Sequence, residues 1–186
     1  MKIQNVTSMA AVVTTVFLSA CGQNSGSSPT NAPAAVPLPP EIVIPGGVFV
    51  PEVPTKIRNA RLTGSDKCAV DSINAKQLPK DGSWNISKAD GLRISGWAVD
   101  GSTNAAVPEV FVRLQGASQS YHAVSTSRGQ RRDVSMALGV PESLNVGVEL
   151  RASLEHVSAG SYKISLIQIS SSAGSECHIP GSVTIK

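Results

Sequence analysis

The sequence predicts an all-β protein: an antiparallel β-sandwich with one short helical turn, preceded by a disordered tether. Three observations support this fold class. Apolar and polar residues alternate over short runs from Gly91 onward, without long stretches of helical periodicity. Asp-Gly pairs, a strong turn signal, occur at 81–82, 90–91 and 100–101. Eight of the twelve prolines lie between residues 22 and 55, a composition that disfavours a packed core.

Residues 1–20 have the features of a secretory signal peptide. Lys2 is followed by an apolar run over 10–17, which is too short to span a bilayer, since spanning needs about 20 residues. The run ends in Leu-Ser-Ala-Cys, which resembles the lipobox of bacterial lipoproteins. This resemblance implies cleavage before Cys21, a diacylglycerol thioether on its sulfur and acylation (for example with palmitate) of its new amine. The alternative is an ordinary signal peptide with an incidental cysteine.

The lipobox resemblance also implies a location. Gly22 follows the cysteine where an aspartate resembles an inner-membrane retention signal, so an outer-membrane anchor is expected if the cell is Gram-negative. The domain would then face either the periplasm or the cell surface. The expected membrane contact is through the lipid on Cys21, since two or more acyl chains anchor a protein stably.

Residues 21–55 are expected to form the lipidated tether, rich in proline and serine. Within it, EIVIPGGVFVPEV over 41–53 is unusually apolar and β-branched. Because proline has no backbone N–H to donate, this segment could form an edge strand but not a central one. Three interpretations remain open: this segment docks on its own domain, it binds a partner, or it is plain linker.

Residues 56–186 have the size of one domain, and its strands are expected at spacings of about ten residues. In GLRISGWAVDG, alternate residues from Leu92 to Ala98 share one face. The later strands show the same alternation, with these faces: Val110, Val112 and Leu114; Tyr121 and Ala123 against His122 and Val124; Val146, Val148 and Leu150; Tyr162, Ile164 and Leu166. CHIPGSVTI closes the chain. The one helical turn is expected over 132–140, with Asp133 as N-cap and Pro141 ending it.

The cysteine count predicts a disulfide. If Cys21 carries lipid, Cys68 and Cys177 remain, and no CxxC pair indicates zinc. Because exported compartments are oxidising, these two are expected to pair. The bond would join the start of the folded region to its end.

The order of the strand motifs carries a second resemblance. GLRISGWAVDG, PEVFVRL, Tyr-His-Ala, RRDV and NVGVELRASLEHVSAGSYKISLI follow one another between residues 91 and 169. They are similar to a β-sandwich module of exported and polysaccharide-associated bacterial proteins, with GWA-x-D, R-P-D-V and L-x-x-G-x-Y motifs. Arg132 stands where proline is usual, and Val148 where phenylalanine is usual. The resemblance implies an immunoglobulin-like fold and no established catalytic role.

Composition and motifs argue against several function classes. From Cys21 onward the chain has 15 basic and 13 acidic residues, and a net charge of +2 is too small to imply a nucleic-acid partner. Neither GxSxG, HExxH, a P-loop nor GxGxxG is present, so we expect no enzyme and no cofactor. DGSWN and DGSTN place oxygens at alternate positions, but the glycine and glutamate of a calcium loop are missing. Both are expected to be Asx-type turns, and no metal site is expected.

Two binding hypotheses remain. In the first, the domain is a non-catalytic module that binds an envelope protein or supports envelope assembly. In the second, it binds cell-wall or extracellular polysaccharide through Trp97, Tyr121, Arg128 and Arg131. Trp97 has the wrong parity for the face of Leu92, so it points away from the core unless Gly96 forms a bulge. Both interpretations of Trp97 stay open: a buried plug or an exposed platform. The Arg128–Arg132 cluster is either a solvated loop or a contact for an acidic polymer or lipid headgroup.

Overall fold

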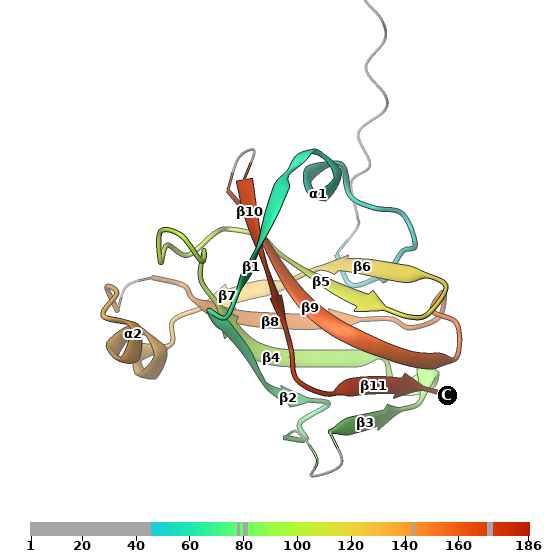
Figure 1. Cartoon of the computed structure of the whole chain (residues 1–186). Helices are drawn as coiled ribbons and strands as arrows, with labels where there is room; N and C mark the ends of the chain where they lie inside the picture. Colours follow the sequence, from blue (N-terminus) through green and yellow to red (C-terminus); the bar gives the residue numbers. More distant parts are fainter. Residues whose placement is uncertain (1–45, 78, 80–81, 143, 171–172) are drawn as a thin grey trace, which may run out of the picture. The chain divides into compact units, whose positions relative to one another are not determined.

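The computed structural model describes residues 46–77, 79, 82–142, 144–170 and 173–186. These residues form two β-sheets with two short α-helices and one 3-10 turn (Figure 1). The elements are α1 (Thr55–Asn59), β1 (Arg61–Ser65), β2 (Cys68–Ile73), β3 (Ser83–Ile86), η1 (Lys88–Asp90), β4 (Leu92–Ala98), β5 (Val110–Gln115), β6 (Ser120–Val124), β7 (Ser127–Gly129), α2 (Arg132–Leu138), β8 (Gly147–Ala152), β9 (Gly160–Ser170), β10 (Ala173–His178) and β11 (Ser182–Ile185). The predicted signal peptide, Cys21 and most of the predicted tether lie outside the described residues. Among the described residues, no helix has the length and apolar character needed to cross a membrane.

The chain is an all-β sandwich, as predicted. One sheet has seven strands, in the order β1-β10-β9-β11-β3, with β5 and β6 attached through β9. The other has four strands, in the order β2-β4-β8-β7. Most neighbours are antiparallel, but β1–β10 and β11–β3 are parallel. This departs from the purely antiparallel expectation: β1 and β3 come early in the chain and add to strands formed near its C-terminus, so no hairpin joins either pair.

The core lies between the two sheets and follows the predicted alternation. Leu92 and Ile94 of β4 pack in one cluster with Val112 and Leu114 of β5. Trp84 of β3 joins this cluster and donates its indole N–H to the carbonyl oxygen of Lys76 at 3.2 Å. A buried tryptophan therefore keeps its one polar atom satisfied.

The G-x-Y motif at the start of β9 has a packing explanation. The Tyr162 hydroxyl donates a hydrogen bond to the carbonyl oxygen of Ser158 at 2.7 Å. Its ring meets Tyr121 edge to face, with centroids 5.9 Å apart. This arrangement is that of a tyrosine corner, in which a tyrosine at a strand start bonds back to the preceding loop. The motif thus stabilises the connection between β8 and β9.

The helical turn is confirmed, but its two ends differ from the expectation. Asp133 lies inside the first turn of α2, and Arg131 occupies the N-cap position without a side-chain capping bond. Gly139 ends the helix in the left-handed conformation, with φ 65° and ψ 30°, before Pro141 is reached. Glycine adopts this backbone conformation without a Cβ penalty, so it acts as the stop.

The predicted disulfide is present. Cys68 lies on β2 of the four-stranded sheet and Cys177 on β10 of the seven-stranded sheet, with Cα atoms 6.1 Å apart. The bond therefore links the two sheets directly. It closes a sequence separation of 109 residues.

The segment before β1 packs on the domain. Phe49 is fully buried in the main core, and Val48 and Val50 form isolated bridges with Ser153 and His122. Docking of residues 46–53 is therefore observed, while residues 41–45 lie outside the described part of the chain. The core thus begins before Lys56, the expected domain boundary, because Phe49 fills space between the sheets.

Candidate binding face

The outer faces of the two sheets are exposed to different degrees. On the seven-stranded sheet, Ile57 of α1 packs over Phe111 and Ile167, and all three are buried. On the four-stranded sheet, the outward residues of β4 and β8 include Arg93 and Arg151, which are exposed. α1 therefore covers part of the first face, although Gln115 and Lys163 further along it are exposed. The outer face of β2-β4-β8-β7 has exposed arginines on its two central strands. We refer to it as the open face.

Trp97 lies on the open face, as its parity predicts. β4 pairs with β8 in continuous register from Leu92 to Trp97, so Gly96 does not re-aim the tryptophan toward the main core. The bulge lies instead on β2, where the register with β4 shifts between Val70 and Ser72. The Trp97 ring is partly buried.

A small second cluster accounts for the burial of Trp97. Its centre is formed by Val99, Val134 and Val146, with Trp97 and Leu138 packed against it. Because Val134 and Leu138 belong to α2, the helix covers part of the ring. Trp97 is thus a partly buried plug between the sheet and α2, with the rest of its surface open.

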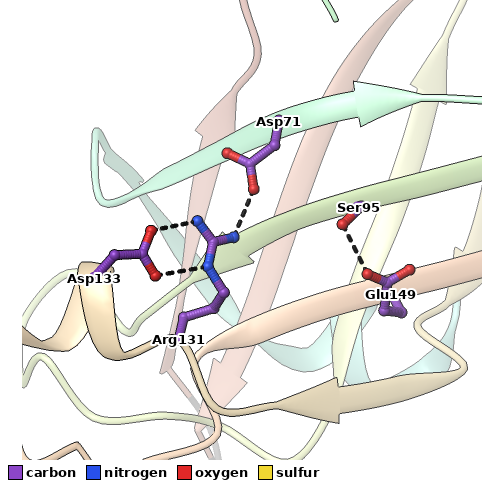
Figure 2. A network of polar contacts seen from close by, with 5 residues as sticks. All are labelled: Asp71, Ser95, Arg131, Asp133 and Glu149. Atoms are coloured by element: carbon purple, nitrogen blue, oxygen red, sulfur yellow. Dashed lines mark hydrogen bonds and ion pairs between the residues drawn. The ribbon is translucent and has the colours of Figure 1, made fainter. Parts of the chain in front are cut away.

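Arg131 is the centre of an ion-pair network (Figure 2). Its side chain packs against Gly147, the cross-strand partner of Trp97. Its guanidinium donates two hydrogen bonds to Asp133, of 2.9 and 2.7 Å, and one to Asp71, of 2.6 Å. Asp71 is the residue skipped at the β2 bulge, which places its carboxylate within reach. The hydrogen bonds that Asp133 accepts from Arg131 hold the pKa of Asp133 at about 2, and the bonds that Arg131 donates to Asp133 and Asp71 raise the pKa of Arg131.

A second polar pair lies next to this network. Ser95 of β4 donates a hydrogen bond to the Glu149 carboxylate of β8 at 2.7 Å (Figure 2). The two residues are direct cross-strand partners. Both residues are partly exposed. The open face therefore offers several hydrogen-bonding groups held by the sheet and by one another.

Two other predicted site residues have structural roles. Tyr121 is only 1% exposed, and its hydroxyl contacts Gln119 and Ser158 at 3.0 Å, so its ring presents no face for stacking. Arg128 donates to the carbonyl oxygens of Ala98 and Asn145, at 3.0 and 3.1 Å. Burial lowers the pKa of Arg128 to about 10. Of the four candidates, the structure brings only Trp97 and Arg131 together on the open face.

The second repeated Asp-Gly motif forms the expected Asx-type turn. Asp100 Oδ1 accepts hydrogen bonds from the backbone N–H groups of Ser102 and Thr103, at 3.0 and 2.9 Å. A further bond from the Ser102 hydroxyl is the main reason that the pKa of Asp100 is lowered. Asp81 of the first motif lies outside the described residues. In the described part of the chain, no group of three His, Cys, Asp or Glu side chains is placed to hold a metal.

A serine–histidine contact occurs on the covered sheet. Ser165 Oγ lies 2.9 Å from His178 Nδ1, and Glu176 lies 3.9 Å from that same nitrogen. A nucleophile–base relay requires the serine and the carboxylate on opposite ring nitrogens. Ser165 is also fully buried. This geometry supports no catalytic assignment to the group.

Comparison with known proteins finds no matching family model, no matching curated protein and no matching solved structure. The assignment of the open face therefore rests on its own geometry. Sequence reasoning missed Asp71, Ser95 and Glu149. These residues alternate with apolar neighbours, which indicates that their side chains point outward. Only the pairing of the strands places them on the same face as Arg131.

Proposed function

We propose that the chain is a lipid-anchored cell-envelope protein whose sandwich is a non-catalytic binding module, with the open face as its binding surface. The observation that carries this proposal is the difference between the two outer faces. On one, Ile57 of α1 packs over Phe111 and Ile167, whereas the other carries Trp97 and the Arg131 network. A surface held rigid by strands and ion pairs loses little entropy on binding.

The anchor is supported by the lipobox resemblance of Leu-Ser-Ala-Cys and by the number of residues between Cys21 and the folded part. Twenty-five residues separate Cys21 from Gly47, where the described backbone first contacts the sandwich through Ser153. Substituting Cys21→Ser should move the protein from the membrane fraction to the soluble fraction. Unchanged membrane retention of this variant would refute the anchor. A full-length Cys68→Ala/Cys177→Ala variant serves as a control, because it retains Cys21.

The binding surface can be tested in cells by site-specific photo-crosslinking. Ser127 of β7 is exposed and pairs with Glu149, so a photoreactive residue there samples the open face. Asn59 at the end of α1 is equally exposed and samples the covered side. A discrete envelope product formed from position 127 but not from position 59 supports the proposal. Equal products from both positions, or none from position 127, count against it.

A second candidate function is carbohydrate binding, and one observation favours it. Trp97 keeps part of its ring exposed next to Arg131, Asp71 and the Ser95–Glu149 pair. Planar polar groups that bind hydroxyls beside an aromatic ring suit a sugar, whose ring faces are apolar and whose edge is polar. The ligand would be a cell-wall or extracellular polysaccharide.

Tryptophan fluorescence tests this second candidate. In a Trp84→Phe background, Trp97 is the remaining tryptophan, so emission reports on the open face alone. A spectral shift with sacculi or purified extracellular polysaccharide, abolished by Asp71→Asn/Glu149→Gln, supports sugar binding. Asp66→Asn is a control carboxylate away from the face. The sugar hypothesis fails if Trp97→Ala lowers the melting temperature sharply while polysaccharide binding is unaffected.

A further inference from the structure

Two arginines of the open face lie directly opposite each other. Arg93 of β4 and Arg151 of β8 are cross-strand partners, and both are exposed. Like charges in this position are unfavourable unless an anion lies between them. Among the ion pairs of the described residues, none involves either arginine. Neither arginine is therefore neutralised by an ion pair within the described residues.

The arginines line a hollow of about 380 Å³ at the η1 end of β4. Lys88 and Asp90 also line it, so its walls carry three cations and one carboxylate. Gly91 contributes bare backbone: its φ is 63°, and a Cβ there would lie 2.9 Å from the carbonyl oxygen of Ala152. Glu149, two residues before Arg151 on β8, is bonded to Ser95. The hollow thus has room and net positive charge for an anionic group.

The described chain joins the sandwich at the wall of this hollow. Ser153, which lines the hollow, donates its backbone N–H to the carbonyl oxygen of Gly47 at 2.8 Å and pairs with Val48. A Cβ on Gly47 would lie 3.4 Å from the carbonyl oxygen of Arg151. Figure 1 shows the C-terminus and the end of β3, after which η1 follows, at the end of the sandwich away from α2. The positive hollow therefore lies beside the point where residues 47 and 48 contact the sandwich.

We propose that Arg93, Arg151 and Lys88 form a phosphate-binding site for anionic phospholipid headgroups at the membrane surface. The inference rests on the proposed anchor, which holds the domain close to such a surface. The planar guanidinium fork matches the oxygens of a phosphate, and a lysine adds a point charge beside it. The lipid on Cys21 would already hold the protein at the membrane, so headgroup binding by the hollow becomes an intramolecular step. The resulting high effective concentration allows even a weak headgroup site to be occupied.

A membrane source is favoured over a soluble polyanion by position. The site lies at the junction with the anchor-bearing segment, whereas Asp71, Asp133 and Glu149 line the rest of the open face. A long polyanion laid along β4 would meet these carboxylates. A single lipid headgroup is small enough to contact the hollow without reaching these carboxylates.

The experiment uses the chain from residue 21 onward with Cys21→Ser, so that no acyl chain contributes. Co-sedimentation is measured with phosphatidylcholine vesicles with and without phosphatidylglycerol, at low and physiological salt. We expect binding only to vesicles with phosphatidylglycerol. Arg93→Gln/Arg151→Gln should lower this binding at least about tenfold. The reason is that each basic residue close to an anionic membrane surface strengthens binding by several-fold. The matched control Arg61→Gln/Arg132→Gln removes the same charge from other surfaces and should retain most of the binding.

Three outcomes would overturn the proposal. Equal binding to both vesicle types shows that headgroup charge is irrelevant, and equal loss in both double variants shows only diffuse attraction. Displacement of the protein from vesicles by an acidic polysaccharide, at a concentration where inorganic phosphate has no effect, assigns the hollow to a soluble polymer. These results are separate from the anchor itself, because fractionation of Cys21→Ser in cells tests the anchor without reference to Arg93 or Arg151.

Discussion

Val50 and His122 exchange both of their backbone hydrogen bonds, Val50 N–H to His122 O at 3.0 Å and His122 N–H to Val50 O at 2.8 Å. This bridge adds the segment before α1 to the edge of β6. It also places that segment over the His122 ring, which is 2% exposed. The segment that leads from the proposed anchor is therefore part of the folded domain, and several expected outcomes depend on this contact.

The docked segment should contribute strongly to stability through Phe49. Phe49→Ala removes a fully buried ring from the main core and should lower the free energy of unfolding by about 3–5 kcal/mol. Urea denaturation followed by fluorescence measures the change. Val53→Ala, in the same segment but 38% exposed, should change it by less than about 1 kcal/mol. Similar effects of the two substitutions would show that the segment does not pack as described.

His122 should make stability depend on pH. Burial, together with the nearby Arg113 charge, lowers its pKa from 6.5 to about 4 in the folded protein. The unfolded chain therefore takes up the proton first as pH falls. The free energy of unfolding is therefore highest, as far as His122 is concerned, above pH 6.5. It falls progressively between pH 6.5 and 4, by about 3 kcal/mol in total.

The pH dependence is measured by denaturation across that range. His122→Asn should flatten the profile between pH 6.5 and 4. His156→Asn, at an exposed position, should leave the profile unchanged. An unaltered slope in His122→Asn would contradict the buried, uncharged state of this histidine.

The disulfide should be a major source of stability, because it crosses between the sheets. For a separation of 109 residues, chain entropy predicts a loss of about 4–5 kcal/mol when the bond is removed. Cys68→Ala/Cys177→Ala should show this loss in denaturation experiments, and reducing agent should reproduce it in the original protein. Cys21→Ser should unfold at the original denaturant concentration. A disulfide contribution below about 1 kcal/mol would mean that the two sheets are held independently of the bond.

Gly96 should resist substitution because β2 passes directly over it. A Cβ at this position would fall against the carbonyl oxygen of Ala69 and 3.0 Å from the Cα of Val70. Gly96→Ala should therefore destabilise the protein by about 1–3 kcal/mol, as for overpacked cores. Gly129→Ala on β7, where no atom lies within 4 Å of the new Cβ, is the matched control. Equal melting temperatures for the two variants would argue against the β2–β4 register.

Much of the fold follows from local patterns. GLRISGWAVDG predicts a strand between two turns, and β4 runs from Leu92 to Ala98 with alternate residues in the core. The parity of Trp97 likewise predicts its outward direction. Period-2 alternation is sufficient here because burying one face of a strand determines which side chains point inward.

Less of the candidate site could be predicted, because it depends on how distant strands pair. Tyr121 and Trp97 look equally suited to a ligand in the sequence, yet one is enclosed by the loop around Ser158 and the other lies on the open face. Arg131 stands out in its basic cluster, but Asp71 is 60 residues away and reaches it only through a bulge. The opposition of Arg93 and Arg151 is invisible without the β4–β8 register.

The sequence by itself determined the fold class, the short helix and the cysteine pairing, and it predicts the export and lipid signals. These depend on side-chain alternation, on turn residues and on a count of thiols, all of which are properties of the chain read in order. Only the tertiary structure decided the parallel edge strands, the burial of Phe49 and His122, and which outer face stays open. Those features arise from packing between segments far apart in the chain, where shape and register select among contacts that local sequence leaves equivalent.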